Sequence, residues 1–386
     1  MPAFSVEESN DCLMNPPIRI LHAIGSLNQG GSQSFVMNLY RAIDRSRIQF
    51  DFVIEHPGEL YYAEEILSLG GDVIELQPFT GSNVISYRRQ WQRLLGGSSR
   101  WAALHSHVRS TAALYVPIAR KNGLKTIVHS HSTCESAGLK GLVKRVMELP
   151  LRRIADYHFA CSEEAGRWLF GDRLFDKGDV TIVPNAIETK KYVYDEKIRS
   201  AVRRELGIGD VPIFGHVGRL SKPKNHLFLL KVFEEILKTR SDAKLVLVGD
   251  GELRQLIEDA VSAKSLDDSV LMLGHRDDAN RLYQAMDVLL MPSLYEGLPV
   301  TLVESQAASL PAVITDTITK EVDIVNGLVR RVSLHSPIEK WAEASLSFLG
   351  IARVNTSAHI ATAGFDVAIA AGRLTDLYMK MNGSSR

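Results

Sequence analysis

The 386-residue sequence has little cysteine, no net charge and no long apolar run, and each shortage argues against a class of protein. Its cysteines, Cys12, Cys134 and Cys161, are odd in number and lack metal-ligand spacing, which is typical of reduced thiols in a cytosol. Because 45 basic residues balance 45 acidic ones, nucleic-acid binding through bulk positive charge is disfavoured. No apolar stretch reaches the ~20 residues that a membrane-spanning helix needs.

The N-terminus also lacks the features of a secretion signal. Residues 1–16 contain Glu7, Glu8 and Asp11 but no basic residue and no apolar segment. We therefore expect residues 1–17 to form a disordered tail. The rest, with 45% hydrophobic and 23% charged residues overall, is long enough for two globular domains.

Short apolar runs alternate with amphipathic stretches of helical period, and this pattern occurs twice along the chain. The first set of predicted strands covers 18–24, 50–54, 72–76, 103–107, 125–129, 157–161 and 180–183. The second set covers 212–217, 244–248, 269–273, 287–291 and 312–315, with helices predicted at 226–239, 252–264, 278–285 and 300–309. Strands that alternate with helices of this length form parallel sheets, so the fold class is α/β with two doubly wound domains.

The stretch 292–311 carries the strongest chemical signal. Glu296 lies on a loop after a buried strand, and Glu304 lies about one turn into the following helix. The free amides of the helix start can bind an anion. Two acids around such amides suit a ligand with several hydroxyls and a phosphate. The alternative is an ordinary helix start with a solvated glutamate.

Three other strand ends carry ligand-binding residues. Arg219 and Lys224 follow the strand 212–217 and suit a diphosphate, while Gly249 and Arg276 follow the next two strands and frame the same crevice. The Gly30-Gly31 pair lets a ligand approach the backbone. Because this loop is not Gly-x-Gly-x-x-Gly, the evidence for a dinucleotide is weak.

Two neighbouring strands end in the tripeptide His-Ser-His, at His105–His107 and His129–His131. Such histidines could bind zinc, but no carboxylate or cysteine has a convincing ligand role beside them. Lining a ligand crevice at the carboxyl ends of the strands is an alternative, and so is a core or capping role.

The stretch 138–153 contains five basic residues, one acid and regularly spaced apolar residues. It predicts a basic amphipathic helix. Such a helix could lie on an anionic membrane surface or form an ordinary solvated face.

Taken together, these motifs resemble the family 4 glycosyltransferases of the GT-B fold, most of all their capsular and exopolysaccharide branch. The similarity runs from about residue 18 to about 316. It rests on Arg219 and Lys224-Asn225 after a Gly-Arg turn, the 248–251 turn, and Glu296-x7-Glu304 with Gly-Leu-Pro between the two acids. The resemblance implies two Rossmann-like domains facing across a cleft. Residues 18–190 would bind the acceptor, 191–366 the nucleotide-sugar donor, and a C-terminal helix in 367–386 would return to the first domain.

The resemblance also implies retaining transfer from a nucleotide diphosphate sugar, commonly a UDP-sugar, to a glycan or lipid-linked acceptor. No cofactor or essential metal is expected, in agreement with the lack of an Asp-x-Asp triplet. The expected location is cytoplasmic, with peripheral contact to the inner face of the cell membrane through 138–153, and no nucleic acid is expected as a partner.

The family resemblance assigns expected roles to individual residues. Arg219 and Lys224 would neutralise the donor diphosphate, Glu296 would bind the transferred sugar, and Glu304 the ribose. His131 would touch the sugar or the acceptor. The remaining expected binding residues are Gly30, Gly31, Asn185, Gly218, Gly249, Arg276, Gly297, Leu298 and Pro299.

Two departures from the family pattern accompany this assignment. Ser309 replaces a glycine that is common in the family, and the match weakens after Asp316. Two rival functions use the same scaffold: a nucleotide-sugar epimerase and a non-catalytic nucleotide-sugar binding subunit.

Overall fold

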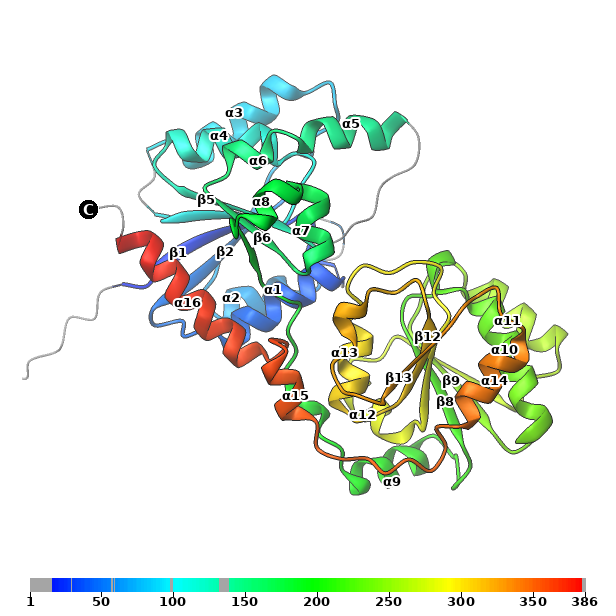
Figure 1. The fold of residues 1–386 in the computed structure, drawn as a ribbon. Helices are drawn as coiled ribbons and strands as arrows, with labels where there is room; N and C mark the ends of the chain where they lie inside the picture. The colour runs from blue at the N-terminus through cyan, green and yellow to red at the C-terminus, as the bar shows by residue number, and fades with distance from the viewer. Residues whose placement is uncertain are drawn as a thin grey trace, which may run out of the picture.

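The computed structural model describes residues 16–28, 30–56, 58, 60–97, 100–131 and 139–383, without the side chains of residues 139 and 140. Most of the expected disordered tail, residues 1–15, lies outside this range. Figure 1 shows two α/β units joined by two crossings of the chain.

The first unit contains a parallel sheet with the strand order β3-β2-β1-β4-β5-β6-β7 within the described residues. Its strands are β1 (Ile18–Ala23), β2 (Ile48–Ile54), β3 (Val73–Glu75), β4 (Ala103–Ser106), β5 (Lys125–Ser130), β6 (Tyr157–Ala160) and β7 (Val180–Ile182). Its helices are α1 (Gly31–Ala42), α2 (Ala63–Ser68), α3 (Val84–Leu95), α4 (Ala112–Lys121), α5 (Leu139–Glu148), α6 (Leu151–Ile154), α7 (Glu163–Phe170) and α8 (Asp172–Asp176). Every residue of β2 is buried, as expected of a central parallel strand covered on both faces.

The second unit contains a parallel sheet with the strand order β10-β9-β8-β11-β12-β13. Its strands are β8 (Ile213–Val217), β9 (Lys244–Val248), β10 (Val270–Gly274), β11 (Val288–Met291), β12 (Ala312–Thr315) and β13 (Val329–Val332). Its helical segments are η1 (Thr189–Tyr192), α9 (Glu196–Glu205), η2 (Lys222–Lys224), α10 (His226–Thr239), α11 (Arg254–Ala263), α12 (Ala279–Ala285), α13 (Val300–Ala307), η3 (Lys320–Val322), α14 (Ile338–Leu346) and α15 (Ser357–Thr362). The predicted class, two doubly wound α/β domains, is confirmed.

The last helix, α16 (Val367–Gly383), lies against the first unit, where Figure 1 shows it in red. Its buried Leu374, Tyr378 and Met381 share a core with Phe50 and Phe52 of β2. A parallel bridge between Ile187 and Asp366 joins the two crossings of the chain. The C-terminus therefore completes the core of the first unit.

The domains also touch through polar contacts. The Tyr61 hydroxyl donates to Asp277 Oδ1 at 2.9 Å. The backbone amides of Glu163 and Glu164, at the start of α7, donate to the Glu321 carboxylate at 2.8 and 3.2 Å. A carboxylate of the second unit thus occupies a helix N-terminus of the first, where the helix dipole favours negative charge.

Three details differ from the sequence predictions. The helix predicted over 138–153 breaks near Pro150 into α5 and α6, since proline cannot donate a backbone hydrogen bond. The helix predicted over 300–309 ends at Ala307, and Ser309 adopts a left-handed conformation with φ 54°. This conformation explains why glycine is common in the family at that position. The strand β13 was not predicted. No helix in the described part of the chain combines the length and apolarity needed to cross a membrane.

Candidate active site

Lys224 and Glu296 meet at the carboxyl ends of two neighbouring strands. The Lys224 Nζ lies 2.6 Å from Glu296 Oε1, and the Ser293 hydroxyl donates to the same oxygen at 2.7 Å. The two charged side chains are only 17% and 12% exposed. Because β8 and β11 are adjacent, the loops that follow them converge although 72 residues separate the pair. A cation and an acid are therefore held together at the mouth of the sheet, where open α/β sheets bind ligands.

The turn that carries Lys224 has a fixed backbone. Asn225 adopts a left-handed conformation with φ 58°, and its side-chain amide donates to the Pro292 carbonyl at 3.1 Å. This bond ties the end of η2 to the loop after β11. Behind it, a Cβ on Gly249 would lie 2.0 Å from the Gly218 carbonyl oxygen, so the close approach of these two loops requires glycine at 249.

Two predicted helix starts offer free backbone amides. In α13, Pro299 is the N-cap residue and makes no side-chain cap, and Leu298 before it is 8% exposed. In α1, Gly30 is the N-cap residue, again without a side-chain cap, and a Cβ on Gly31 would meet nothing within 4 Å. Both helix starts can therefore accept negative charge, one from each domain.

Glu304 is held by two tyrosine hydroxyls that the sequence analysis missed. Tyr192 donates to its Oε1 and Tyr283 to its Oε2, each at 2.8 Å. Burial raises the pKa of Glu304, against the opposing effect of the two hydroxyls. The tyrosines come from η1 and α12, so no local sequence pattern links them to this acid.

The two expected arginines are bound to carboxylates of their own domain. Arg219 is 73% exposed and lies 3.1 Å from Glu252. Arg276 pairs with Asp278 at 2.7 Å and with Glu205 at 2.8 Å. Of the expected cations, Lys224 is thus the one that directly contacts an expected acid.

The histidines at the strand ends form a stacked cluster, to which β1 adds His22. The sheet register pairs His22 with His105, a proximity that the sequence analysis did not use. Two groups of three have ligand nitrogens within 4.8 Å of one another: His22, His105 and His107, and His107, His129 and His131. However, the His22–His107 and His107–His131 nitrogens lie 2.9 and 2.7 Å apart, closer than the ~3.4 Å that tetrahedral zinc ligation implies. The geometry favours hydrogen-bonded imidazoles over a zinc site.

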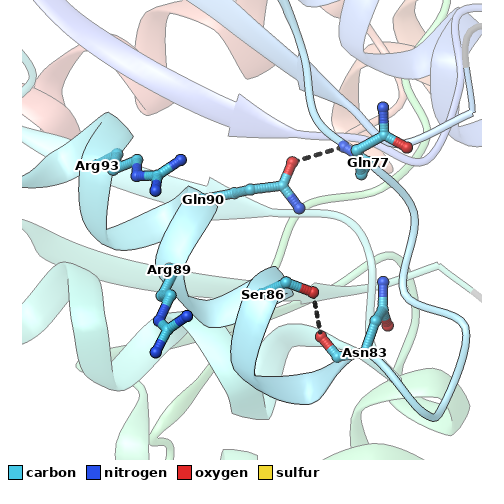
Figure 2. A pocket seen from close by; sticks show the side chains of 6 residues that line it. All are labelled: Gln77, Asn83, Ser86, Arg89, Gln90 and Arg93. Carbon is cyan, nitrogen blue, oxygen red and sulfur yellow. Dashed lines mark hydrogen bonds between the residues drawn. The ribbon is translucent and has the colours of Figure 1, made fainter.

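A separate polar hollow of about 500 Å³ lies beside α3. Figure 2 shows its lining, Gln77, Asn83, Ser86, Arg89, Gln90 and Arg93. The backbone N–H of Gln77 donates to Gln90 Oε1 at 2.9 Å, and the Ser86 hydroxyl donates to the backbone carbonyl of Asn83 at 3.0 Å. None of the expected site residues lines it.

Comparison with known proteins identifies the family. Residues 198–363 match the family described as Glycosyl transferases group 1, and residues 30–186 match the Glycosyl transferase 4-like domain. A protein of Bacillus subtilis (strain 168) named "Putative glycosyltransferase EpsF" is 36% identical over 369 residues, which cover 93% of this chain and 96% of that protein. The chain belongs to the family 4 glycosyltransferases. It is an enzyme that transfers a sugar from a nucleotide sugar.

One further sequence relative and one solved structure are also similar to this family 4 glycosyltransferase. A UDP-Gal:alpha-D-GlcNAc-diphosphoundecaprenol alpha-1,3-galactosyltransferase of Escherichia coli is 27% identical over 231 residues, 56% of this chain and 58% of that protein. The crystal structure of a glycosyltransferase from Rickettsia africae ESF-5 superposes with a TM-score of 0.75 at 16% identity, covering 96% of this chain and all of that one. The expected GT-B fold of two Rossmann-like domains is thereby confirmed.

Proposed function

We propose that this glycosyltransferase moves a sugar, with retention of anomeric configuration, from a UDP-sugar to a glycan or lipid-linked acceptor of capsular or exopolysaccharide synthesis. We further propose that it needs no metal ion and no cofactor. The observation that carries the proposal is the Lys224–Glu296 contact of 2.6 Å at the carboxyl ends of β8 and β11. A diphosphate sugar needs a cation for its phosphates and an acceptor for its sugar hydroxyls at one place.

The mechanism follows from the charge that develops during transfer. When the bond between the anomeric carbon and the phosphate oxygen breaks, negative charge grows on the leaving diphosphate. A fixed ammonium at Lys224 stabilises this charge more in the transition state than in the ground state. In the proposed front-face reaction, the acceptor oxygen bonds to the anomeric carbon, and its proton passes to the leaving phosphate. Glu296 holds the sugar hydroxyls throughout.

The names of relatives support the finer points. The Escherichia coli relative is named for a UDP-sugar donor and a diphosphoundecaprenol-linked acceptor. We therefore place a UDP-sugar in the cleft, with its ribose at Glu304. By the same reasoning, the acceptor is a sugar on a lipid diphosphate.

A lipid-linked acceptor would bring the enzyme to a membrane surface, and α5 offers a suitable face. Leu142, Val143 and Val146 are 62%, 52% and 58% exposed, and Leu149 just after the helix is 48% exposed. Of the basic residues, Arg145 is bound to the Trp168 carbonyl and Arg152 to the Leu169 carbonyl. Attachment would therefore depend on the apolar face at least as much as on charge.

One experiment separates the proposal from its rivals. The protein is incubated with a panel of UDP-sugars, with and without a lipid-linked acceptor, and UDP release and sugar identity are followed. A transferase releases UDP in an acceptor-dependent manner. An epimerase converts the donor sugar without an acceptor, and a binding subunit does neither.

A further inference from the structure

Glu304 is a partly buried acid with no cation beside it. It lies about one turn into α13, the helix that follows β11 and Glu296. Among the described residues its hydrogen-bond partners are the hydroxyls of Tyr192 and Tyr283, and it forms no salt bridge there. Charges withdrawn from water are normally paired, because they lose their hydration. An acid kept here without a cation is therefore suited to a ligand that brings hydrogen-bond donors of its own.

The two hydroxyls leave part of the carboxylate open. An ionised carboxylate accepts about four hydrogen bonds, two on each oxygen. Tyr192 takes one position on Oε1 and Tyr283 takes one on Oε2, each at 2.8 Å. Burial raises the pKa of both phenols well above the usual value, so both hydroxyls keep their protons and donate. One acceptor position remains on each oxygen, and two such positions side by side match a ligand with two neighbouring hydroxyls.

The backbone holds both tyrosines in place. The buried Gln284 side chain donates to the Tyr192 carbonyl at 3.0 Å. Arg353 donates to the carbonyls of Tyr283 and Ala308 at 2.9 and 2.7 Å, and so ties the end of α12 to the end of α13. A cation is favoured at these two helix C-termini by the helix dipole. The two donors that meet Glu304 thus have positions that the fold fixes before any ligand arrives.

We propose that Tyr192 and Tyr283 are positioning residues, which fix the Glu304 carboxylate so that its two open acceptor positions take the 2′- and 3′-hydroxyls of the donor ribose. The proposal rests on the nucleotide-sugar donor proposed above. A carboxylate already fixed does not have to be ordered when the ligand binds. The tyrosines would therefore set a specificity, the preference for a ribonucleotide over a deoxyribonucleotide, without touching the ligand.

Nucleotide binding tests this specificity without any transfer. Isothermal titration calorimetry compares the Kd of UDP with those of 2′-deoxy-UDP and 3′-deoxy-UDP. Wild-type protein should bind UDP roughly 10- to 150-fold more tightly than either analogue, since each lacks one hydrogen bond to a charged group. Tyr192→Phe and Tyr283→Phe keep the rings and remove one donor each. Each should lower the preference for UDP by roughly two- to tenfold, the cost of ordering one side chain, because only a two-point contact needs the carboxylate in one orientation.

A third tyrosine provides the matched control. Tyr194 lies two residues beyond Tyr192, and its hydroxyl donates to the exposed Glu196. Tyr194→Phe should leave the preference for UDP unchanged. If the fully buried Tyr283→Phe variant does not fold, the partly exposed Tyr192→Phe carries the test.

Three outcomes would overturn the proposal. One is a preference for UDP that is unchanged or larger in the folded Tyr192→Phe and Tyr283→Phe variants, since the hydroxyls would then only solvate the acid. Another is an equal loss in Tyr194→Phe, which would indicate general disturbance. The third comes from a Glu304→Ala background, in which Tyr192→Phe should change the preference no further, because residues acting as a unit are not additive. A further loss there would show that Tyr192 acts by another route.

The same measurements separate this proposal from the proposed function. A wild-type protein that prefers UDP to its deoxy analogues but transfers no sugar would refute the transfer reaction and leave the role of the tyrosines standing. Binding of ADP or GDP in place of UDP would refute the UDP donor alone, and that nucleotide and its deoxy forms would then serve for the comparison. Binding of no nucleoside diphosphate would refute both.

Discussion

Replacement of Lys224 by alanine should lower kcat by roughly 10²–10³. The structure supplies the reason for this magnitude. The ammonium is 17% exposed and already fixed at the mouth of the sheet by its contact with Glu296. Such a preorganised group stabilises developing charge without having to be ordered first. Loss of one donor of this kind costs about 2.7–4 kcal/mol of transition-state stabilisation.

A matched control lies on the same turn. Lys222 begins η2, is exposed, and carries the same charge as Lys224 two residues later. If the effect were due to general positive charge at this end of the sheet, Lys222→Ala and Lys224→Ala would behave alike. We expect Lys222→Ala to retain the wild-type kcat, because changes of exposed surface side chains usually have little effect.

The assay is UDP release at saturating acceptor, with donor concentration varied to separate kcat from KM. Thermal unfolding of each variant checks that the protein is folded. This check is needed because Lys224→Ala removes the ammonium beside Glu296 and leaves its Oε1 with the Ser293 hydroxyl of the two contacts described above. A folded Lys224→Ala enzyme with an intact kcat would show that the phosphate site is not on this loop.

Three further predictions concern other parts of the molecule. Burial raises the pKa of Glu304, so the folded chain holds that proton more tightly than the unfolded chain, and the charged form costs stability at neutral pH. Glu304→Gln should therefore raise the Tm at pH 7, and it should also raise the donor KM. The gain in Tm should vanish as the pH falls below the usual carboxyl range. A gain in Tm that does not depend on pH would contradict this reasoning. The two domains should close on the donor, and X-ray scattering should detect this as compaction when UDP is added. Glu321→Ala should weaken the compaction, because it removes the carboxylate that accepts hydrogen bonds from the Glu163 and Glu164 amides at the start of α7. A wild-type radius of gyration that does not change with UDP would argue against closure. Exchange of Leu142 and Val146 for serine should reduce the salt-sensitive flotation of the protein with anionic liposomes. The control variant Leu256→Ser, on the exposed face of α11, should float like the wild-type protein. Equal flotation of all variants would exclude α5 as the membrane contact.

Most of the fold could be predicted because its signals are local. The apolar run at Lys244–Val248 is buried on both faces and forms β9 with the predicted bounds. The helix at His226–Thr239 also has its predicted bounds, set by the left-handed Asn225 that precedes it. In contrast, β13 reads Val-Arg-Arg-Val and is an edge strand, so half of its residues are charged and its pattern is weak.

The candidate site was predictable where a parallel sheet dictates proximity. Residues at the carboxyl ends of neighbouring strands meet, which is why Lys224 and Glu296 were expected in one crevice and are found in contact. The partners of Glu304 were not predictable, since Tyr192 and Tyr283 reach it from segments 112 and 21 residues away. The place of His22 in the histidine cluster required the register of β1 with β4, which no single strand encodes.

The most direct test of the central claim is the stereochemistry of the first product. The enzyme is mixed with an α-linked UDP-sugar and a lipid-linked acceptor, in the presence of a metal chelator, and proton NMR follows the anomeric signals from the earliest time. We expect UDP release to accompany an α-linked product, because the proposed front-face transfer at Lys224 and Glu296 retains the anomeric configuration and needs no metal ion. A β-linked first product, or transfer that stops when the chelator is added, would contradict the account.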